Sequence, residues 1–476
     1  MTPRVPLVVV GGGPAGMAAA AEAAGAGLPA LLLDESPLPG GQIYRLPPEG
    51  FAPPVVDVAT ARGHRLRADT LRGDRLRAEL AASGAEVRGA TSVLGVWPDR
   101  TILWATGDAS GTLHAERIVL ATGARERAVP FPGWTLPGVM TAGAVQSFVG
   151  GMGVRPGSAA LVAGTGPLLL VVALQLHEAG VRVKAVLEAG RPPLSPRLWL
   201  GLWSARDHLR AALAHGRTLR RAGIPIHLGH TIFAARGRGE VEAAEWGPVD
   251  PRDWRPRRDR RNFAEVDLVV AAFGLVPNTE LAELAGCAHE HDPACGTRVP
   301  VRDSAMRTTV PGLFAAGDGA GIGGALSAED EGRIAGIRAA QHAGALATAE
   351  ADRRCAGPLA RRAALAPLRA FLGEWSRPRP GLCELADDDT QVCRCEEVTL
   401  AEVRAALAAG ARDLGEIKLR TRLGMGACQG RNCAAAAAEI VGRVRRCAPA
   451  DAGAIHPRPP ARTVSLGALA GMEHQP

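Results

Sequence analysis

The sequence predicts an α/β protein with two Rossmann-like dinucleotide-binding domains and a small helical domain near the C-terminal end. A pattern of strand, glycine turn, helix and strand occurs twice, at residues 5–33 and 158–188, and four closely spaced cysteines lie between residues 393 and 433. Two such units in one chain indicate two dinucleotide-binding folds. A chain of 476 residues is also too long for a single hydrophobic core.

The bulk composition is that of a globular protein. Hydrophobic residues make up 47% of the chain, and the net charge of +7 rests on arginine, because Lys184 and Lys418 are the only lysines. The densest basic run, residues 252–261, also contains acids and has no aromatic-lined strand pattern around it. We therefore expect a solvated loop there, with an acidic partner as the alternative, and no nucleic-acid partner.

One apolar stretch, residues 156–177, is long enough to span a bilayer and carries no formal charge. Its middle is the sequence GTGP at residues 164–167, which would break a spanning helix. A strand, a glycine turn and a helix explain this stretch better. We therefore expect no membrane span and a cytoplasmic protein.

The first unit is expected to form a strand over residues 5–10, a helix over 14–26 and a second strand over 29–33. Asp34 ends the second strand, 23 positions after the first glycine of the turn, where a carboxylate can accept both ribose hydroxyls. The residues of the turn and the first helical positions are Gly11, Gly13, Pro14, Ala15 and Gly16.

The three glycines of this turn each have a physical role. Gly11 permits the sharp turn, Gly13 lets the backbone approach a pyrophosphate, and Gly16 lets the helix pack against the strand. The N-terminal end of the helix then offers unpaired N–H groups and a positive dipole end to the phosphates. The sequence therefore predicts a dinucleotide at this turn.

The second unit is an impaired copy of the first. Gly164 and Gly166 form its turn, but Leu169 stands where the third glycine belongs and would crowd a pyrophosphate. Glu188, 24 positions after Gly164, suits a free ribose and would repel a 2′-phosphate. NAD or another adenine nucleotide is the ligand expected if one binds, and a vestigial fold kept for architecture or docking is the alternative.

Further strands are expected over residues 85–96, 101–105, 118–121, 267–273 and 312–316, with a helix over 330–345. The resulting domain prediction is a discontinuous first domain at 1–140 and 265–345, a second nucleotide-binding-like domain at 141–264, a connector at 351–386, a cysteine-bearing domain at 387–448 and a flexible tail at 449–476.

Three further segments resemble the two-dinucleotide-fold flavoprotein superfamily that includes thioredoxin and glutathione reductases. They are GGQ at 40–42, IVLATG at 118–123 and GLFAAGD at 312–318. The resemblance implies FAD at the first turn, with Asp318 holding the ribityl and pyrophosphate region. The FAD-binding residues that it adds are Gly41, Gln42, Thr122, Gly123, Gly317 and Asp318.

The reaction of the superfamily's disulfide reductases is not expected here. Such enzymes need a CxxC near the flavin, and this chain has no cysteine before Cys287. The flavin loop offers Gln42, Tyr44 and Arg45, which are poor proton-abstracting groups at neutral pH, and Tyr44 is expected to pack in the core. No catalytic residue can be assigned, so substrate oxidation is expected elsewhere or with a partner chain.

Two cysteine pairs, at 393 and 395 and at 428 and 433, define the C-terminal domain. Thr399 and Glu402 form a capping box that opens a helix, and further helices are expected from Asp413 and over 434–446. Four thiolates can hold a [2Fe–2S] cluster or one zinc ion. The set Cys287, His289, His291 and Cys295 also has zinc-like spacing, but we expect a structural or incidental role for it.

The sequences VCRCEEVT and TRLGMGACQGRNC resemble the ferredoxin-like module of the bacterioferritin-associated type, which holds [2Fe–2S]. The resemblance implies that the ligands are Cys393, Cys395, Cys428 and Cys433.

Over nearly its whole length the chain resembles the α-type subunits of hydrogen cyanide synthase, opine oxidase and proline or hydroxyproline dehydrogenase. The sequences PGGQIYR, ATGARERAVPFPGW, AGTGPLLL and CRCEEVT…GMGACQGRNC carry this resemblance. It implies a partner, a flavoprotein β subunit, which oxidises an amino acid or amine at its C–N bond. One departure is the acidic sequence at 329–331, where a less acidic helix start is usual.

The leading hypothesis is therefore the electron-relaying, FAD- and [2Fe–2S]-containing α-like subunit of a heteromeric amino-acid or amine dehydrogenase or oxidase. A stand-alone NADH-dependent flavoprotein reductase is the rival enzyme, and a non-catalytic scaffold that carries cofactors is the third alternative.

Overall fold

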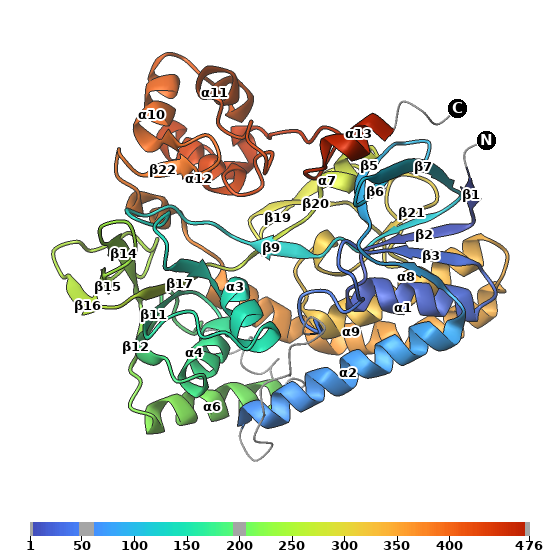
Figure 1. Ribbon diagram of the computed structural model, residues 1–476, viewed down its shortest axis with the longest axis horizontal. Helices are drawn as coiled ribbons and strands as arrows, with labels where there is room; N and C mark the ends of the chain where they lie inside the picture. Colours follow the sequence, from blue (N-terminus) through green and yellow to red (C-terminus); the bar gives the residue numbers. More distant parts are fainter. Residues whose placement is uncertain (1–2, 47–60, 194–205, 472–476) are drawn as a thin grey trace.

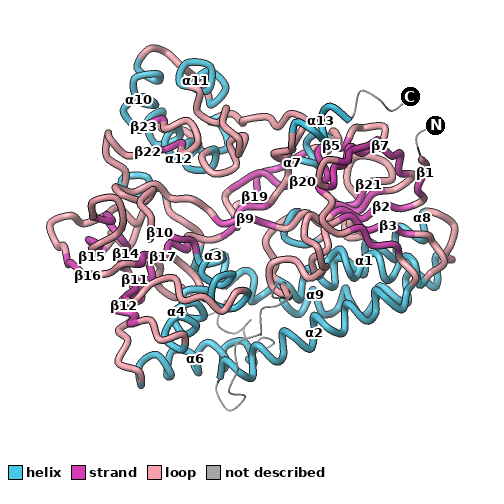
Figure 2. The backbone as a smooth tube through the Cα atoms, in the orientation of Figure 1, coloured by secondary structure: helices cyan, strands magenta, loops and turns pink. Residues whose placement is uncertain are grey.

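The computed structural model describes residues 3–46, 61–193 and 206–471. Two lobes, each built on a parallel sheet, lie side by side, and a helical domain sits above them (Figure 1). Helices predominate on the lower side of both lobes in this view (Figure 2). No helix in the described part of the chain is long and apolar enough to cross a membrane.

The sheet of the first lobe has the order β21-β8-β2-β3-β4, and all its strands are parallel. Val10 at the end of β2 pairs with Leu33 on one side and Leu120 on the other, and Leu120 also pairs with Ala315. The carboxyl ends of these strands are therefore level, which is where ligands bind in open parallel sheets. The strands are β2 (Leu7–Val10), β3 (Ala30–Leu33), β4 (Glu86–Arg88), β8 (Ile118–Leu120) and β21 (Leu313–Ala315).

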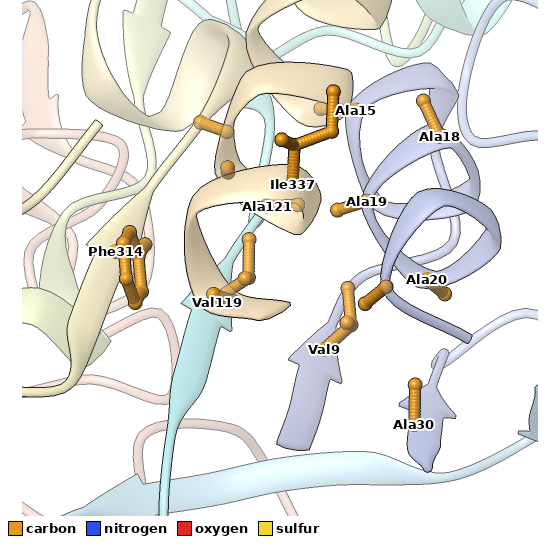
Figure 3. Close-up of a cluster of buried hydrophobic side chains, with 14 of the residues drawn as sticks. Val9, Ala15, Ala18, Ala19, Ala20, Ala30, Val119, Ala121, Phe314 and Ile337 are labelled. Carbon is orange, nitrogen blue, oxygen red and sulfur yellow. The ribbon is translucent and has the colours of Figure 1, made fainter. Parts of the chain in front are cut away.

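Small residues pack two helices closely over this sheet. A Cβ built on Gly332 of α8 (Ala325–His342) would lie 2.0 Å from the carbonyl oxygen of Ala15 in α1 (Pro14–Gly25). Gly336, one helical turn later, approaches Ala19 in the same way. Figure 3 shows Ala15 and Ala19 on the side of α1 that faces Ile337 of α8. The opposite face of the sheet packs against β1 (Arg4–Val5), β5 (Ser92–Val96), β6 (Thr101–Thr106) and β7 (Ala109–Ala115).

The second lobe repeats the arrangement with the sheet order β10-β17-β11-β12-β13. Helices α3 (Ala142–Gln146), α4 (Leu168–Glu178) and α6 (Arg206–Arg221) belong to one side of it. An antiparallel sheet of β14 (His230–Arg236), β15 (Ala243–Pro248) and β16 (Asn262–Glu265) packs on the other. The main strands are β10 (Val139–Thr141), β11 (Ala159–Gly164), β12 (Arg182–Glu188), β13 (Ile226–Leu228) and β17 (Leu268–Ala272).

The predicted boundary of the first domain at residue 265 needs a correction. Strand β17 lies in the second sheet, paired in parallel with β10 and β11. Its apolar residues alone could not identify the sheet, because both sheets are parallel and buried. The two lobes are joined by an antiparallel ribbon of β9 (Ala124–Glu126) and β18 (Leu275–Pro277), which crosses between them (Figure 1).

The region predicted as a connector, 351–386, is mostly helical. Helix α9 (Thr348–Ser376) packs along α8 and contains Pro358 and Pro367 within its length. Packing along α8 keeps the helix intact through both prolines, against their low helix propensity. A short 3-10 helix, Pro380–Leu385, then leads into the C-terminal domain. The long helix α2 (Ala61–Ser83) was also not foreseen in the sequence.

The C-terminal domain has its own apolar core and confirms its predicted helix starts. Thr399 and Glu402 form the reciprocal capping box of α10 (Leu400–Ala408), and Asp413 caps α11 (Leu414–Thr421). Helix α12 (Ala434–Arg445) begins directly after Cys433. Strands β22 (Gln391–Cys393) and β23 (Val398–Thr399) hold the first cysteine loop.

The segment after this domain differs from the predicted flexible tail. Residues up to 471 return to the first lobe, where Ala461 and Ala468 are buried. Ala468 lies in helix α13 (Leu466–Ala470) and accepts a hydrogen bond from Ser110 Oγ at 2.5 Å. Polar contacts add to these apolar ones, since His456 lies 2.5 Å from Glu283 and Ser465 donates to Asp108 at 2.8 Å.

Candidate flavin and cysteine sites

The loop at residues 40–42 lies against the first glycine turn, as the resemblance implied. A Cβ built on Gly41 would lie 2.8 Å from the Cα of Gly13. Gly40 N–H donates to the carbonyl oxygen of Gly12 at 2.8 Å and fixes the loop there. Gln42 is exposed and accepts a hydrogen bond from Arg45 at 2.8 Å. Tyr44 is buried in the core of the lobe, which agrees with the packing role expected for it.

The late motif meets the same site from the other side. A Cβ on Gly317 would lie 2.9 Å from the Cβ of Ala15, and one on Gly319 would lie 2.5 Å from Thr122 Oγ1. Gly123 adopts a positive φ of 64° directly after Thr122. The structure thus brings together the four segments that the sequence singled out: residues 11–16, 40–42, 122–123 and 317–318.

Glycine is required at two positions of the turn. Gly11 has a φ of +101°, and a Cβ there would lie 2.4 Å from the carbonyl oxygen of Ala121. A Cβ on Gly16 would lie 1.7 Å from the carbonyl oxygen of Gly11. No side chain caps the first turn of α1, which begins at Pro14 and carries no acid there. The first turn therefore leaves its N–H groups and dipole to an anionic ligand.

Two carboxyl groups flank this turn, of which Asp34 is buried and Asp318 is half-buried. Asp34 accepts a hydrogen bond from the N–H of Ser36 at 2.7 Å, and burial raises its pKa. Asp318 accepts from the N–H groups of Gly323 and Gly324 at 2.8 and 2.9 Å, and burial also raises its pKa. Both carboxyls lie at the strand ends, as a ribose or ribityl contact requires. These residues fit FAD.

The acidic departure at residues 329–331 is neutralised by arginines. Glu329 pairs with Arg75 at 2.7 Å, and Asp330 pairs with Arg361 at 2.6 Å. Glu331 is fully buried, pairs with Arg302 and Arg362 at 2.7 and 2.9 Å, and accepts the N–H of Gly317 at 3.0 Å. Burial opposes the charge of Glu331, but the two arginines outweigh it and lower its pKa. The acidic residues are thus paired with arginines, and Glu331 holds the backbone of Gly317 in the late flavin motif.

The second glycine turn is covered by the end of α9. A Cβ on Gly166 would lie 3.1 Å from the Cβ of Ser376, and one on Gly190 would lie 2.6 Å from the carbonyl oxygen of Trp375. Leu169 is buried against the sheet, and α4 begins only at Leu168, two residues after the turn, whereas α1 follows its turn at once. Trp375 and Ser376 could not be assigned to this site from the sequence, because nothing local relates them to a glycine turn about 200 residues earlier.

Glu188 faces into this turn. Its two carboxyl oxygens accept the N–H groups of Gly166 at 2.7 Å and Gly190 at 2.8 Å. Burial nevertheless dominates and raises the pKa of Glu188 to about 7. Gly164, with a φ of +151°, packs against the carbonyl oxygen of Ala272.

The four predicted ligand cysteines lie together as two pairs. The thiol of Cys393 contacts that of Cys433, and Cys395 contacts Cys428, so each loop contributes one member of each pair. The bond from Cys433 and the backbone N–H groups of Gly424, Glu396 and Cys395 lower the pKa of Cys393 to about 5. The same contact with Cys393 raises the pKa of Cys433.

Close backbone approach shapes this site further. A Cβ on Gly426 would lie 2.3 Å from the Cβ of Cys395, so only glycine lets the two loops meet. All nine cysteines are free thiols. In the described ranges, no three histidine, cysteine or acidic side chains are arranged to hold a metal ion. This holds for the set from Cys287 to Cys295 and also for the four predicted ligands, which meet as two pairs. The four thiols and the N–H groups around Cys393 nonetheless form a donor set that fits a cluster of negative charge.

The two lobes and the first turn define a flavoprotein-type dinucleotide-binding protein. Residues 5–345 match the pyridine nucleotide-disulphide oxidoreductase family, and the chain belongs to that family. Residues 388–472 match the sarcosine oxidase A3 domain. The family implies FAD, and the chain is accordingly a flavin oxidoreductase.

Relatives match this chain nearly from end to end. The HcnB subunit of hydrogen cyanide synthase from Pseudomonas aeruginosa is 35% identical over 97% of both chains. An opine oxidase subunit from Agrobacterium tumefaciens is 33% identical over 98% of this chain and 92% of its own.

Solved structures share the fold. L-proline dehydrogenase from P. horikoshii has a TM-score of 0.70 at 22% identity and covers 98% of this chain and 80% of its own. Thioredoxin reductase of T. acidophilum, at 20% identity and a TM-score of 0.50, covers 70% of this chain and 97% of its own. The L-proline dehydrogenase structure therefore resembles this chain beyond the two lobes, whereas thioredoxin reductase matches a smaller part of it.

Proposed function

We propose that this chain is the electron-relaying subunit of a heteromeric dehydrogenase or oxidase that acts on an amino acid or amine. It holds FAD at the first glycine turn and a [2Fe–2S] cluster on Cys393, Cys395, Cys428 and Cys433. The observation that carries the proposal is the meeting of these four thiols in a domain fused to a flavin fold.

The relation between the two cofactors gives this architecture its use. FAD exchanges two electrons with a substrate, whereas a [2Fe–2S] cluster carries one at a time. The role of this chain's own residues is to bind the two cofactors and to orient them. The turn from Gly11 to Gly16 receives the pyrophosphate, Asp34 takes the ribose, and Asp318 takes the ribityl region. The two cysteine loops hold the iron.

A partner chain accounts for the missing catalytic groups. The described flavin loop offers Gln42 and Arg45, which are poor proton acceptors, and the carboxyls of Asp34 and Asp318 are assigned to the sugar contacts of the cofactor. The relatives that match end to end are named as subunits, of hydrogen cyanide synthase and of opine oxidase. We infer that a flavoprotein β subunit oxidises the C–N bond of the substrate and passes electrons to this chain.

The second glycine turn is a weaker candidate site. Gly164, Gly166 and Glu188 would contact NAD or another adenine nucleotide, but Trp375 and Ser376 cover the turn. This cover argues against the rival function, an NADH-dependent reductase. Stopped-flow mixing with NADH alone would favour the rival if it bleached the flavin.

The test uses the purified chain together with the flavoprotein encoded beside it. Anaerobic addition of proline, hydroxyproline, glycine or an opine should bleach the flavin with one of them. The variants C428S and C447S distinguish an electron-relaying subunit from a non-catalytic scaffold. C447S is the matched control, because Cys447 lies outside both cysteine pairs. C428S should abolish turnover with an external acceptor, while C447S keeps it. Bleaching with none of these substrates, or full turnover by C428S, would contradict the proposal.

A further inference from the structure

Arg125 joins the flavin lobe to the second cysteine loop. It lies in β9, which crosses below the C-terminal domain (Figure 1). Its Nε donates to the carbonyl oxygen of Arg431 at 3.0 Å. Its Nη1 donates to Asn278 Oδ1 at 2.8 Å and to Glu280 Oε1 at 2.9 Å. The guanidinium of Arg125 thus forms hydrogen bonds with both the flavin lobe and the cysteine domain.

Arg431 completes the junction from the other side. It lies between Cys428 and Cys433, and its Nε is 3.3 Å from Glu280 Oε1, the oxygen that also accepts from Arg125. Its Nη1 donates to the carbonyl oxygen of Cys428 at 3.4 Å, and its Nη2 donates to the carbonyl oxygen of Ala461. The loop that carries two predicted iron ligands is therefore fastened to the flavin lobe by charged groups.

The same junction reaches the flavin turn. Asn278, which binds Arg125, donates from Nδ2 to the carbonyl oxygen of Thr122 at 3.0 Å, and Thr122 Oγ1 donates to the carbonyl oxygen of Asn278 at 2.6 Å. Thr122 contacts Gly319 of the late flavin motif. A continuous set of hydrogen bonds therefore runs from the flavin site through Asn278 and Arg125 to the loop of Cys428.

The junction carries excess positive charge in a partly desolvated place. The side chains of Arg125, Glu280 and Arg431 are 23%, 16% and 11% exposed. Burial lowers the pKa of both arginines, and Arg462 acts on both as a further positive charge. Two arginines thus share the carboxylate of Glu280 beside Cys428, and Arg462, which pairs with Glu35 at 3.7 Å, adds a further positive charge nearby. Charge at such a depth is screened by salt less than charge at the surface.

We propose that Arg125, Glu280 and Arg431 are positioning residues that dock the cysteine domain on the flavin lobe, and that the excess charge of the two arginines favours the reduced cluster. The inference rests on the proposed function for its second half. One-electron reduction adds a negative charge to a cluster, and nearby positive charge and hydrogen bonds raise its reduction potential.

The test is an EPR-monitored redox titration of the full-length chain. R125Q should make the equilibrium constant for reduction of the cluster about tenfold smaller, which lowers its midpoint potential by ~59 mV for one electron. R125K should restore most of this loss. E280Q should raise the potential, because it removes the opposing charge. R412Q, which removes an exposed arginine of the same domain, should leave it unchanged. A merely structural role would shift R125Q and E280Q in the same direction, and that result would overturn the charge effect.

Docking has a readout that needs no cluster. Hydrogen exchange of the backbone amides in residues 424–433 should rise in R125Q and stay at the wild-type level in R412Q. Equal exchange in the two variants would overturn the docking half. If the wild-type chain gives no EPR signal of a cluster, the proposed function is overturned. If the wild type gives the signal and the midpoint potential of R125Q is the same as that of the wild type, only the charge effect of the arginines is overturned.

Discussion

Gly41 packs directly on Gly13: a Cβ built on Gly41 would lie 2.8 Å from the Cα of Gly13. The backbones of the glycine turn and of the loop at residues 40–42 therefore approach too closely for a side chain at Gly41. Gly41 also has a φ of +61°, which disfavours any β-branched side chain. The flavin site depends on this contact.

Substitution of Gly41 tests that dependence. G41V should purify with little FAD and regain it with at least about tenfold lower affinity, because valine both clashes with Gly13 and strains the backbone. G25A is the matched control, since nothing lies within 4 Å of a Cβ at Gly25 in α1. The FAD content is read from the flavin absorbance per chain. Wild-type FAD content in G41V would show that the loop does not seal the site.

The buried pair between Glu331 and its two arginines should contribute strongly to stability. E331Q leaves Arg302 buried with an unbalanced charge, and breaking a buried pair of this kind costs about 3–5 kcal/mol. The control E416Q removes an exposed pair with Arg412 and should change the free energy of unfolding far less, because water screens that pair. Denaturant unfolding followed by circular dichroism measures both. Equal losses would contradict the role given to Glu331.

Glu188 should make stability depend on pH. Burial raises its pKa in the folded chain to about 7, whereas an unfolded carboxyl titrates near 4.3. The folded state therefore binds the extra proton in this window, and the free energy of unfolding should fall as the pH rises from about 4.3 to about 7. E188Q should flatten this dependence, while E265Q, at an exposed site, should not. An unchanged pH dependence in E188Q would contradict the buried, protonated carboxyl.

The cover over the second turn should limit nucleotide binding. W375A removes the indole carbon that lies 2.8 Å from the Cβ position of Gly190, and S376G removes the side chain beside Gly166. The double variant should bind ADP at least about tenfold more tightly than the wild type, since a tenfold change needs only about 1.4 kcal/mol. W97A removes a tryptophan from the other lobe and serves as the control. Isothermal titration calorimetry measures the affinities. Equal and tight binding by all three chains would mean that α9 leaves the site open.

Local chemistry explains what the sequence could predict. The strands around Gly11 and Gly164 are apolar runs bounded by glycine turns, and Thr399 with Glu402 marks a helix start through two hydrogen bonds within four residues. Such patterns require only neighbours in the chain. The other flavin segments, at 40–42, 122–123 and 317–318, were named through their resemblance to known flavoproteins, and the structure brings them together with the first turn.

Long-range relationships explain what the sequence could not. Strand β17 has the same apolar composition as strands of either sheet, so its place in the second lobe depends on pairing with β10 and β11. The prolines of α9 suggested a connector, although packing along α8 keeps the helix intact. Arg125 stood in a motif without a role, because its partner Arg431 lies more than 300 residues later.

The most direct test of the central claim is an EPR spectrum of the chain and its partner flavoprotein, frozen after anaerobic addition of the substrate that bleaches the flavin. The account predicts a rhombic [2Fe–2S] signal in the wild type and in C447S, and a bleached flavin without that signal in C428S. Stoichiometric zinc in place of iron, or bleaching with no cluster signal in the wild type, would contradict it.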